Sequence, residues 1–198
     1  MMKKVLVFGS QEFGGVIKAL VAQCGYEFAG FIDDYNSGEE VLGGFEEVSR
    51  RYPPATHDLA IAVGYNNLLA RWEVFQKVRR SGYGLPRLVH PQAYVHDLEN
   101  VGEGSFVMAG AVVDVNARLG PLTVVWPGVV VNHDSGVAAN TFLSPNCTVC
   151  GFVTIGEHCF VGAGTTIVDH VNVPRKSFLK AGSLYTAKSK FSKRERPA

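Results

Sequence analysis

The sequence lacks the long apolar segment that a membrane-spanning helix needs. Nowhere among its 198 residues do eighteen apolar residues follow one another, although a transmembrane helix needs about that many. The first five residues include two lysines and lead directly into a strand pattern, without the apolar region and cleavage site of a signal peptide. The sequence therefore predicts a cytoplasmic protein that makes no membrane contact.

The sequence also lacks an excess of charge of either sign. Its 19 Lys and Arg residues oppose 18 Asp and Glu residues, which gives a formal net charge of +1. Binding to nucleic acid or to an anionic membrane surface generally relies on a basic excess. Nucleic acid is therefore not an expected partner.

Cysteine is scarce, and its spacing does not indicate a metal site. Of the four cysteines, Cys147 and Cys150 form a C-x-x-C, but neither a second pair nor a histidine follows at zinc-ligand spacing. Cys147 and Cys159 fall on inward positions of the repeat described next, so we expect buried thiols. The six histidines form no metal-binding pattern either, and no metal is predicted.

The prominent feature of the sequence is a repeat of six residues. From Val101 to Leu179 an aliphatic residue occupies every sixth position, and a second, mostly small residue follows four positions later. A period of six matches neither a helix nor a simple strand alternation, and it indicates short units stacked along an axis. Three such units would close a coil of eighteen residues. The repeat therefore predicts a parallel β-helix with three faces and about five coils.

The corners between faces should hold residues that tolerate a positive φ. Glycine and asparagine are frequent there, and we expect this role for Gly102, Gly104, Gly110, Gly120, Asn132, Gly156, Gly162, Gly164 and Gly182.

The first part of the chain has a different pattern. Residues 3–9 and 26–32 read as buried strands, and residues 11–23 between them have a helical spacing of apolar residues. The second strand ends at Asp33 and Asp34, as in the first half of a nucleotide-binding βαβ unit. The glycines of residues 9–15 depart from the G-x-G-x-x-G spacing. On the pattern alone, a nucleotide-binding domain and a purely structural Rossmann-like domain both remain open.

Two further elements complete the predicted organisation. Residues 57–64 read as a third strand, and residues 68–80 as a helix that follows a capping Asn66-Asn67 pair. We predict a Rossmann-like α/β domain over residues 1–85, a β-helix over residues 86–184 and a basic tail over residues 185–198.

This combination resembles the hexapeptide-repeat sugar acetyltransferases, the family of the bacillosamine-pathway N-acetyltransferases and the sialic acid O-acetyltransferases. The resemblance rests on the two patterns, on residues 64–67, Arg71 and residues 90–93 near the junction, and on Val131-Asn-His-Asp134. It covers roughly residues 3–183. It implies that the β-helix is left-handed.

The resemblance also implies an activity. Such enzymes transfer the acetyl group of acetyl-CoA to a nucleotide-linked amino sugar, here in the first instance a UDP-4-amino-4,6-dideoxy sugar of bacterial glycan biosynthesis. His133 would be the general base that takes the proton from the amine, and Asp134 would orient its ring. Histidine suits this role because its ordinary pKa lies near physiological pH. Transfer would be direct, without an acyl-enzyme, in a homotrimer with active sites between subunits.

Binding residues follow from the same resemblance. The pantetheine arm of acetyl-CoA would lie near Gly151, Ala163, Ala181 and Gly182. Gly151 stands one coil beyond His133, and its missing side chain predicts room for the thioester. The nucleotide would contact the N-terminal domain at Gly9, Ser10, Asp33, Asp34, Gly64 and Asn66.

Other functions remain open. A sugar O-acetyltransferase of the sialic acid type would use the same base, and a non-catalytic nucleotide-sugar-binding protein would keep the fold alone. A dinucleotide-dependent oxidoreductase is disfavoured by the altered glycine pattern. The chain departs from the resembling family at Trp126 and Phe142, where relatives carry asparagine and histidine, so the acceptor sugar is left undecided.

Overall fold

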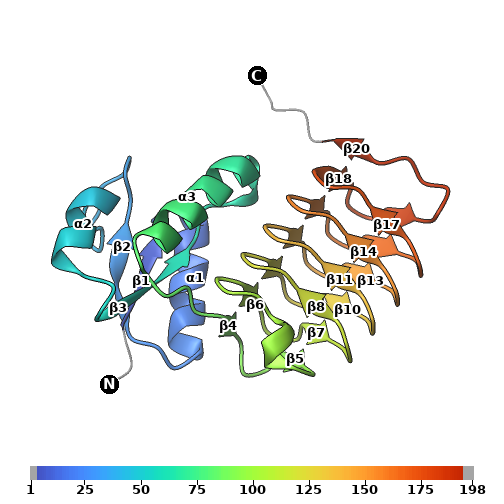
Figure 1. The fold of residues 1–198 in the computed structure, drawn as a ribbon, viewed down its shortest axis with the longest axis horizontal. Helices are drawn as coiled ribbons and strands as arrows, with labels where there is room; N and C mark the ends of the chain where they lie inside the picture. The colour runs from blue at the N-terminus through green and yellow to red at the C-terminus, as the bar shows by residue number, and fades with distance from the viewer. Residues whose placement is uncertain (1–3, 194–198) are drawn as a thin grey trace. The chain divides into compact units, whose positions relative to one another are not determined.

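The computed structural model describes residues 4–193, and the chain divides into two compact units between Leu88 and Val89 (Figure 1). The predicted boundary after residue 85 and the predicted tail over residues 185–198 remain predictions. Residues 1–3 of the predicted first domain and residues 194–198 of the tail lie outside the described part.

The first unit contains a three-stranded parallel sheet in the order β2-β1-β3. Its strands are β1 (Lys4–Phe8), β2 (Phe28–Ile32) and β3 (His57–Ile61). The apolar run of β1 is buried from Val5 to Phe8, as expected for the central strand of a parallel sheet. All three strands coincide with segments predicted as strands.

Two of the three α-helices within residues 4–88 were predicted. Helix α1 (Glu12–Gln23) buries Ile17, Leu20 and Val21, and helix α3 (Leu68–Arg80) follows a 3-10 turn, η1 (Tyr65–Asn67). Asn67 caps α3, because its side-chain oxygen accepts a hydrogen bond from the Ala70 amide at 3.0 Å.

Helix α2 (Phe45–Arg51) was not predicted. It has only seven residues, of which Phe45 and Val48 are buried. Two buried positions are too few for a helical period to be recognised in the sequence.

The second unit is a coil of short strands, which Figure 1 draws from green to red. Among the described residues three sheets run along it, in the orders β5-β7-β10-β13-β16-β19, β8-β11-β14-β17 and β4-β6-β9-β12-β15-β18-β20. A 3-10 turn, η2 (Leu98–Asn100), interrupts the first coil. The strands of the coil are β4 (Leu88–Val89), β5 (Tyr94–Val95), β6 (Phe106–Val107), β7 (Val112–Val113), β8 (Arg118–Leu119), β9 (Val124–Val125), β10 (Val130–Val131), β11 (Gly136–Val137), β12 (Phe142–Leu143), β13 (Thr148–Val149), β14 (Thr154–Ile155), β15 (Phe160–Val161), β16 (Thr166–Ile167), β17 (Asn172–Val173), β18 (Ser177–Leu179), β19 (Leu184–Tyr185) and β20 (Ser192–Lys193).

The register of these sheets confirms the eighteen-residue coil. Val131 pairs with Val113 on one side and with Val149 on the other, eighteen residues away in each direction. Strand β20 is an exception that the sequence did not predict, because it pairs antiparallel with β18.

The interior of the coil is filled by the two inward residues of each hexad. The aliphatic positions from Val101 to Leu179 are buried, and so are Cys147 and Cys159, as predicted. Several of the small inward residues carry hydroxyl groups, which would destabilise the core if they were left without partners. They hydrogen-bond to the backbone instead. Ser135 Oγ, for example, donates to the Cys150 carbonyl at 2.7 Å and accepts from the Val153 amide at 3.1 Å.

One residue in each hexad has a positive φ, three positions after the aliphatic residue. The series runs from Gly104 to Gly182 and includes bulky residues such as Phe152, whose φ is 58°. The predicted positive φ is wrong for five positions: Gly102, Gly120, Asn132, Gly156 and Gly162.

Four of these five positions hold glycine for a different reason. A Cβ at Gly102 would lie 2.4 Å from the Pro121 nitrogen, and one at Gly162 would lie 2.4 Å from the Ala181 nitrogen. Gly120 and Gly156 face the next coil in the same way, with backbone nitrogens at 2.7 and 2.5 Å. The close approach of neighbouring coils excludes a side chain there.

Within residues 4–193, no helix combines the length and the apolar character that crossing a bilayer requires.

Candidate active site

His133 lies at an outward corner of the coil, between β10 and β11. Its neighbours Val131 and Ser135 point into the core and are buried, so the turn between them must face outward. The side chains of His133 and Asp134 are 46% and 36% exposed. The predicted base is therefore accessible from outside the coil.

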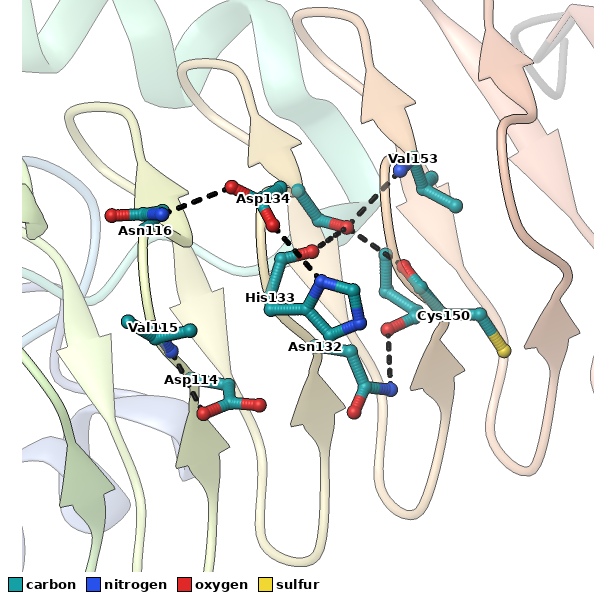
Figure 2. Close-up of polar contacts among 10 residues, drawn as sticks. Asp114, Val115, Asn116, Asn132, His133, Asp134, Cys150 and Val153 are labelled. Atoms are coloured by element: carbon teal, nitrogen blue, oxygen red, sulfur yellow. Dashed lines mark hydrogen bonds and ion pairs between the residues drawn. The ribbon is translucent and has the colours of Figure 1, made fainter.

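Two hydrogen bonds organise this corner (Figure 2). His133 Nδ1 lies 3.0 Å from Asp134 Oδ2, and Asn116 Nδ2 donates to the other carboxylate oxygen, Oδ1, also at 3.0 Å. The hydrogen bond from His133, together with the one from Asn116, lowers the pKa of Asp134 below its ordinary value. An ionised carboxylate only accepts, so Nδ1 carries the proton that it donates to Asp134. The lone pair of Nε2 is then available to accept a proton.

Gly151 lies directly against the imidazole. A Cβ at this position would be 2.8 Å from His133 Cε1 and 3.0 Å from Nε2. The sequence predicted that the missing side chain leaves room for a thioester arm. In the structure the imidazole itself occupies that space.

Two aromatic side chains continue the corner beyond His133. The ring of Phe152 makes an edge contact with the imidazole, with centroids 5.3 Å apart and planes at 85°. The His170 ring stacks on Phe152 at 4.9 Å, with planes 6° apart. Sequence reasoning assigned no role to Phe152, although it stands one coil of eighteen residues after Asp134.

The other predicted cofactor residues lie at a different corner. The Gly182 amide donates to the Ala163 carbonyl at 2.8 Å, and the Ala181 backbone lies close to Gly162. The structure therefore brings Ala163, Ala181 and Gly182 together, in the turns that follow β15 and β18. Gly151 is in the turn that follows β13, one coil after the turn that holds His133.

In the first unit, Ser10 and Asp33 bind to each other at the ends of β1 and β2. Asp33 Oδ2 accepts from both the amide and the hydroxyl of Ser10, at 3.1 and 2.6 Å. Its Oδ1 accepts from the amides of Tyr35 and Asn36 and from the Asn36 side chain. Burial alone would raise the pKa of Asp33, but these hydrogen bonds outweigh it and lower the pKa to about 2. Five donors fill the lone pairs of the carboxylate, so Asp33 holds the loop together.

Asp34 and Gly9 also shape this end of the sheet. Asp34 is exposed, and its Oδ1 accepts from the Phe45 amide at 2.7 Å, at the start of α2. Gly9 has a φ of 108°, and a Cβ there would lie 2.8 Å from the Ala62 carbonyl oxygen. A Cβ at Gly14 would lie 2.2 Å from the Gly9 oxygen, so α1 packs tightly on this turn.

Gly64 and Asn66 are placed after β3. Gly64 caps the 3-10 turn η1, and Asn66 is an exposed residue within it.

A cavity of about 400 Å³ opens near Ser10. It is lined by Ser10, Gln11, Phe31 and residues 37–41. It lies beyond the carboxyl end of the parallel strands, where open α/β sheets commonly bind ligands. Of the residues predicted to contact a nucleotide, only Ser10 lines it. The loop of residues 37–41 was missed, because it carries no pattern that distinguishes it from a surface loop.

Among residues 4–193, no three or more His, Cys, Asp or Glu side chains are grouped so that they could hold a metal ion.

Comparison with known families and structures agrees with the two-part architecture. Residues 4–78 match the PglD N-terminal domain, and residues 134–169 match the bacterial transferase hexapeptide, six repeats. The chain therefore combines a PglD-type N-terminal domain with hexapeptide repeats of the kind found in bacterial transferases. The predicted fold, a Rossmann-like α/β domain followed by a left-handed β-helix, is confirmed.

Solved structures resemble the chain over nearly its whole length. The acetyltransferase domain of PglB from Neisseria gonorrhoeae FA1090 is 26% identical with a TM-score of 0.82, and covers 93% of this chain and 92% of its own. The structure of the same domain in complex with acetyl coenzyme A has a TM-score of 0.80, and the match covers 94% of this chain and 95% of that domain. PerB from Caulobacter crescentus, solved in complex with CoA and GDP-perosamine, is 25% identical with a TM-score of 0.84, over 94% of this chain and 90% of its own. The predicted resemblance to bacillosamine-type sugar acetyltransferases is confirmed.

Proposed function

We propose that the protein transfers the acetyl group of acetyl-CoA to the amine of a nucleotide-linked 4-amino-4,6-dideoxy sugar, with His133 as general base. The assignment of His133 as the base rests on one observation. Nδ1 of His133 is held by the Asp134 carboxylate, and the half-exposed ring keeps Nε2 free to accept a proton. The substrates are supported by PglB, which was solved with acetyl coenzyme A, and by PerB, which was solved with CoA and GDP-perosamine.

The reaction has one proton to move. The amine nitrogen attacks the thioester carbonyl, and Nε2 of His133 takes the proton that the nitrogen loses. Asp134 stabilises the resulting imidazolium through Nδ1. Collapse of the tetrahedral intermediate breaks the carbon–sulfur bond, and the departing CoA sulfur receives the proton from Nε2. The products are the amide and the free thiol, and the histidine returns to its starting state.

The cysteines support direct transfer without an acyl-enzyme. Burial raises the pKa of Cys147 to about 12 and that of Cys159 to about 11, so neither thiol is a thiolate at neutral pH. Burial, with the charge of Asp169, also raises the pKa of Cys150, and Figure 2 shows its sulfur pointing away from the imidazole.

The binding sites are proposed from the predicted residues and their surroundings. Acetyl-CoA would run past the imidazole at Gly151 to the second corner, formed by Ala163, Ala181 and Gly182. The nucleotide would occupy the cavity at the carboxyl end of the sheet. Ser10 would contact it inside the cavity, and the part of the nucleotide that extends beyond the cavity would contact Gly9, Asp34, Gly64 and Asn66. Asp33 would act by holding Ser10 and the following loop.

We further propose that the enzyme works as a homotrimer with its active sites between subunits, in the cytoplasm, for bacterial polysaccharide or glycoprotein synthesis. The exposure of His133 supports the oligomer. A neighbouring subunit would cover the corner and keep water from the thioester.

The test is thiol release from acetyl-CoA with UDP-, dTDP- and GDP-linked 4-amino sugars, and with the corresponding 4-hydroxy sugars. Turnover of an amino sugar, with an amide in the product, supports the proposal and identifies the nucleotide. Turnover of hydroxy sugars alone would replace it with O-acetylation. Binding of a nucleotide sugar without any thiol release would leave a binding protein instead.

A further inference from the structure

Four residues of one corner repeat at intervals of eighteen, and His133 lies beside them. They are Asn116, Asp134, Phe152 and His170, with φ values of 57°, 57°, 58° and 61°. Each occupies the same position in its coil. The series therefore forms a column in which Asn116 precedes Asp134 and Phe152 follows it.

Asn116 fixes the carboxylate that orients the base. Asp134 is exposed, so the surrounding packing does not determine the rotation of its side chain. The amide of Asn116 donates to Oδ1 at 3.0 Å, and Oδ2 is then turned toward His133 Nδ1. Without this amide the carboxylate would rotate in water, and Nδ1 would lose its fixed partner.

Phe152 restrains the imidazole from the side of the next coil. The two rings meet edge to face at 5.3 Å, and His170 stacks behind Phe152 at 4.9 Å. Together with the backbone at Gly151, these contacts allow the ring of His133 only a narrow range of orientations.

The choice of phenylalanine at this position is unfavourable for the fold. A bulky residue with a positive φ is a conformational outlier, and Phe152 is 49% exposed, so it gains little from burial. Its contact with the predicted base gives a reason for it.

We propose that Asn116 and Phe152 are positioning residues for His133, Asn116 by holding the Asp134 carboxylate and Phe152 by packing against the imidazole. This inference rests on the proposed role of His133 as general base. Neither residue needs to touch the substrate.

Replacement by glycine tests both residues, because glycine adopts a positive φ without strain. Lys176→Gly is the matched control, since Lys176 is exposed, has a φ of 61° and stands at another corner. We expect Asn116→Gly and Phe152→Gly each to lower kcat by about 10- to 100-fold. KM for acetyl-CoA should change little, and Lys176→Gly should keep the wild-type kcat.

Two conservative variants separate positioning from general structural damage. Asn116→Asp has the same shape but no amide donor, so it should be as slow as Asn116→Gly. Phe152→Tyr keeps the ring and should retain most of the activity. Nitrogen-15 NMR of the His133 ring should show a single Nδ1–H tautomer in the wild type and a mixture in both Asn116 variants, whether or not the acceptor sugar is known.

The outcomes distinguish this inference from the proposed function. If His133→Ala keeps the full rate, the base assignment fails and the inference fails with it. If His133→Ala is inactive while both glycine variants match Lys176→Gly in kcat and keep the wild-type tautomer, the positioning role alone is overturned. A rise in KM with unchanged kcat for Phe152→Gly would overturn its positioning role by making it a substrate contact.

Discussion

Replacement of Gly151 by alanine should displace the imidazole of His133, the proposed general base, while leaving the fold intact. The new Cβ would lie 2.8 Å from His133 Cε1, whereas carbon atoms in contact prefer at least about 3.5 Å. The imidazole must therefore move by about 0.7 Å. The move is possible because the ring is half exposed.

The substitution should lower the rate of catalysis. Misplacement of a catalytic group by about 1 Å can cost about 100-fold in rate. For Gly151→Ala we expect a kcat that is about 10- to 100-fold lower, equivalent to about 1.4 to 2.7 kcal/mol in the activation free energy. The unfolding temperature should be close to that of the wild type, because the φ of Gly151 is not in the left-handed region.

The assay is the initial rate of thiol release at saturating acetyl-CoA, so that a weaker cofactor contact at Gly151 does not contribute. Gly136→Ala is the control, since a Cβ at Gly136 meets nothing within 4 Å. If Gly151→Ala keeps kcat within about twofold of Gly136→Ala, the imidazole of His133 does not act from the position described.

Three further predictions concern stability and the thiols. Folded Asp33 stays ionised down to a pH of about 2, whereas its unfolded carboxyl has a pKa of about 3.9. The stabilisation of the folded state by ionised Asp33 is thus complete above about pH 4 and is lost as the pH falls toward 2. Asp33→Asn should lower the free energy of unfolding by about 1–2 kcal/mol at pH 7. In urea titrations between pH 4 and 2, the free energy of unfolding of the variant should fall less steeply with pH than that of the wild type. An equally steep fall in both proteins would contradict this. Ser135→Ala should lower the free energy of unfolding by about 1–3 kcal/mol, because the hydroxyl satisfies two buried backbone groups. An unchanged midpoint of urea unfolding would contradict that role. Native Cys147 and Cys159 should resist iodoacetamide at pH 8 and react after unfolding, so rapid labelling of the folded protein would contradict their burial.

The repeat could be predicted from the sequence because each hexad carries its own signal. The side chains of a coil point in or out according to their place in the hexad, so the aliphatic positions revealed both the period and the core. The contact between His133 and Asp134 joins neighbouring residues at an outward turn, and the sequence also suggested it.

The contacts between coils were harder to predict. Asn116 and Phe152 stand eighteen residues from Asp134 on either side, and their residue types did not distinguish them from other corner residues. The glycines Gly102 and Gly162 showed the same limit. Close packing against the next coil explains them, and a rule based on turn propensity assigned them a positive φ.

The N-terminal domain illustrates a different limit. An acid after the second strand of a βαβ unit suggested a ligand contact at Asp33. That contact stays a prediction, and the structure adds that the carboxylate is surrounded by donors from Ser10, Tyr35 and Asn36. Such a network depends on the path of the loop, and the path of a loop is not encoded in a local pattern.

In the proposed reaction, His133 accepts the proton that the sugar amine loses. The most direct measurement is kcat for His133→Asn against the wild type, at saturating acetyl-CoA and with the best amino-sugar acceptor. Asparagine has a side-chain amide in place of the ring but cannot act as a base near neutral pH. We expect His133→Asn to lower kcat by at least about 100-fold while the fold is unchanged. A variant that retains the wild-type kcat would contradict it.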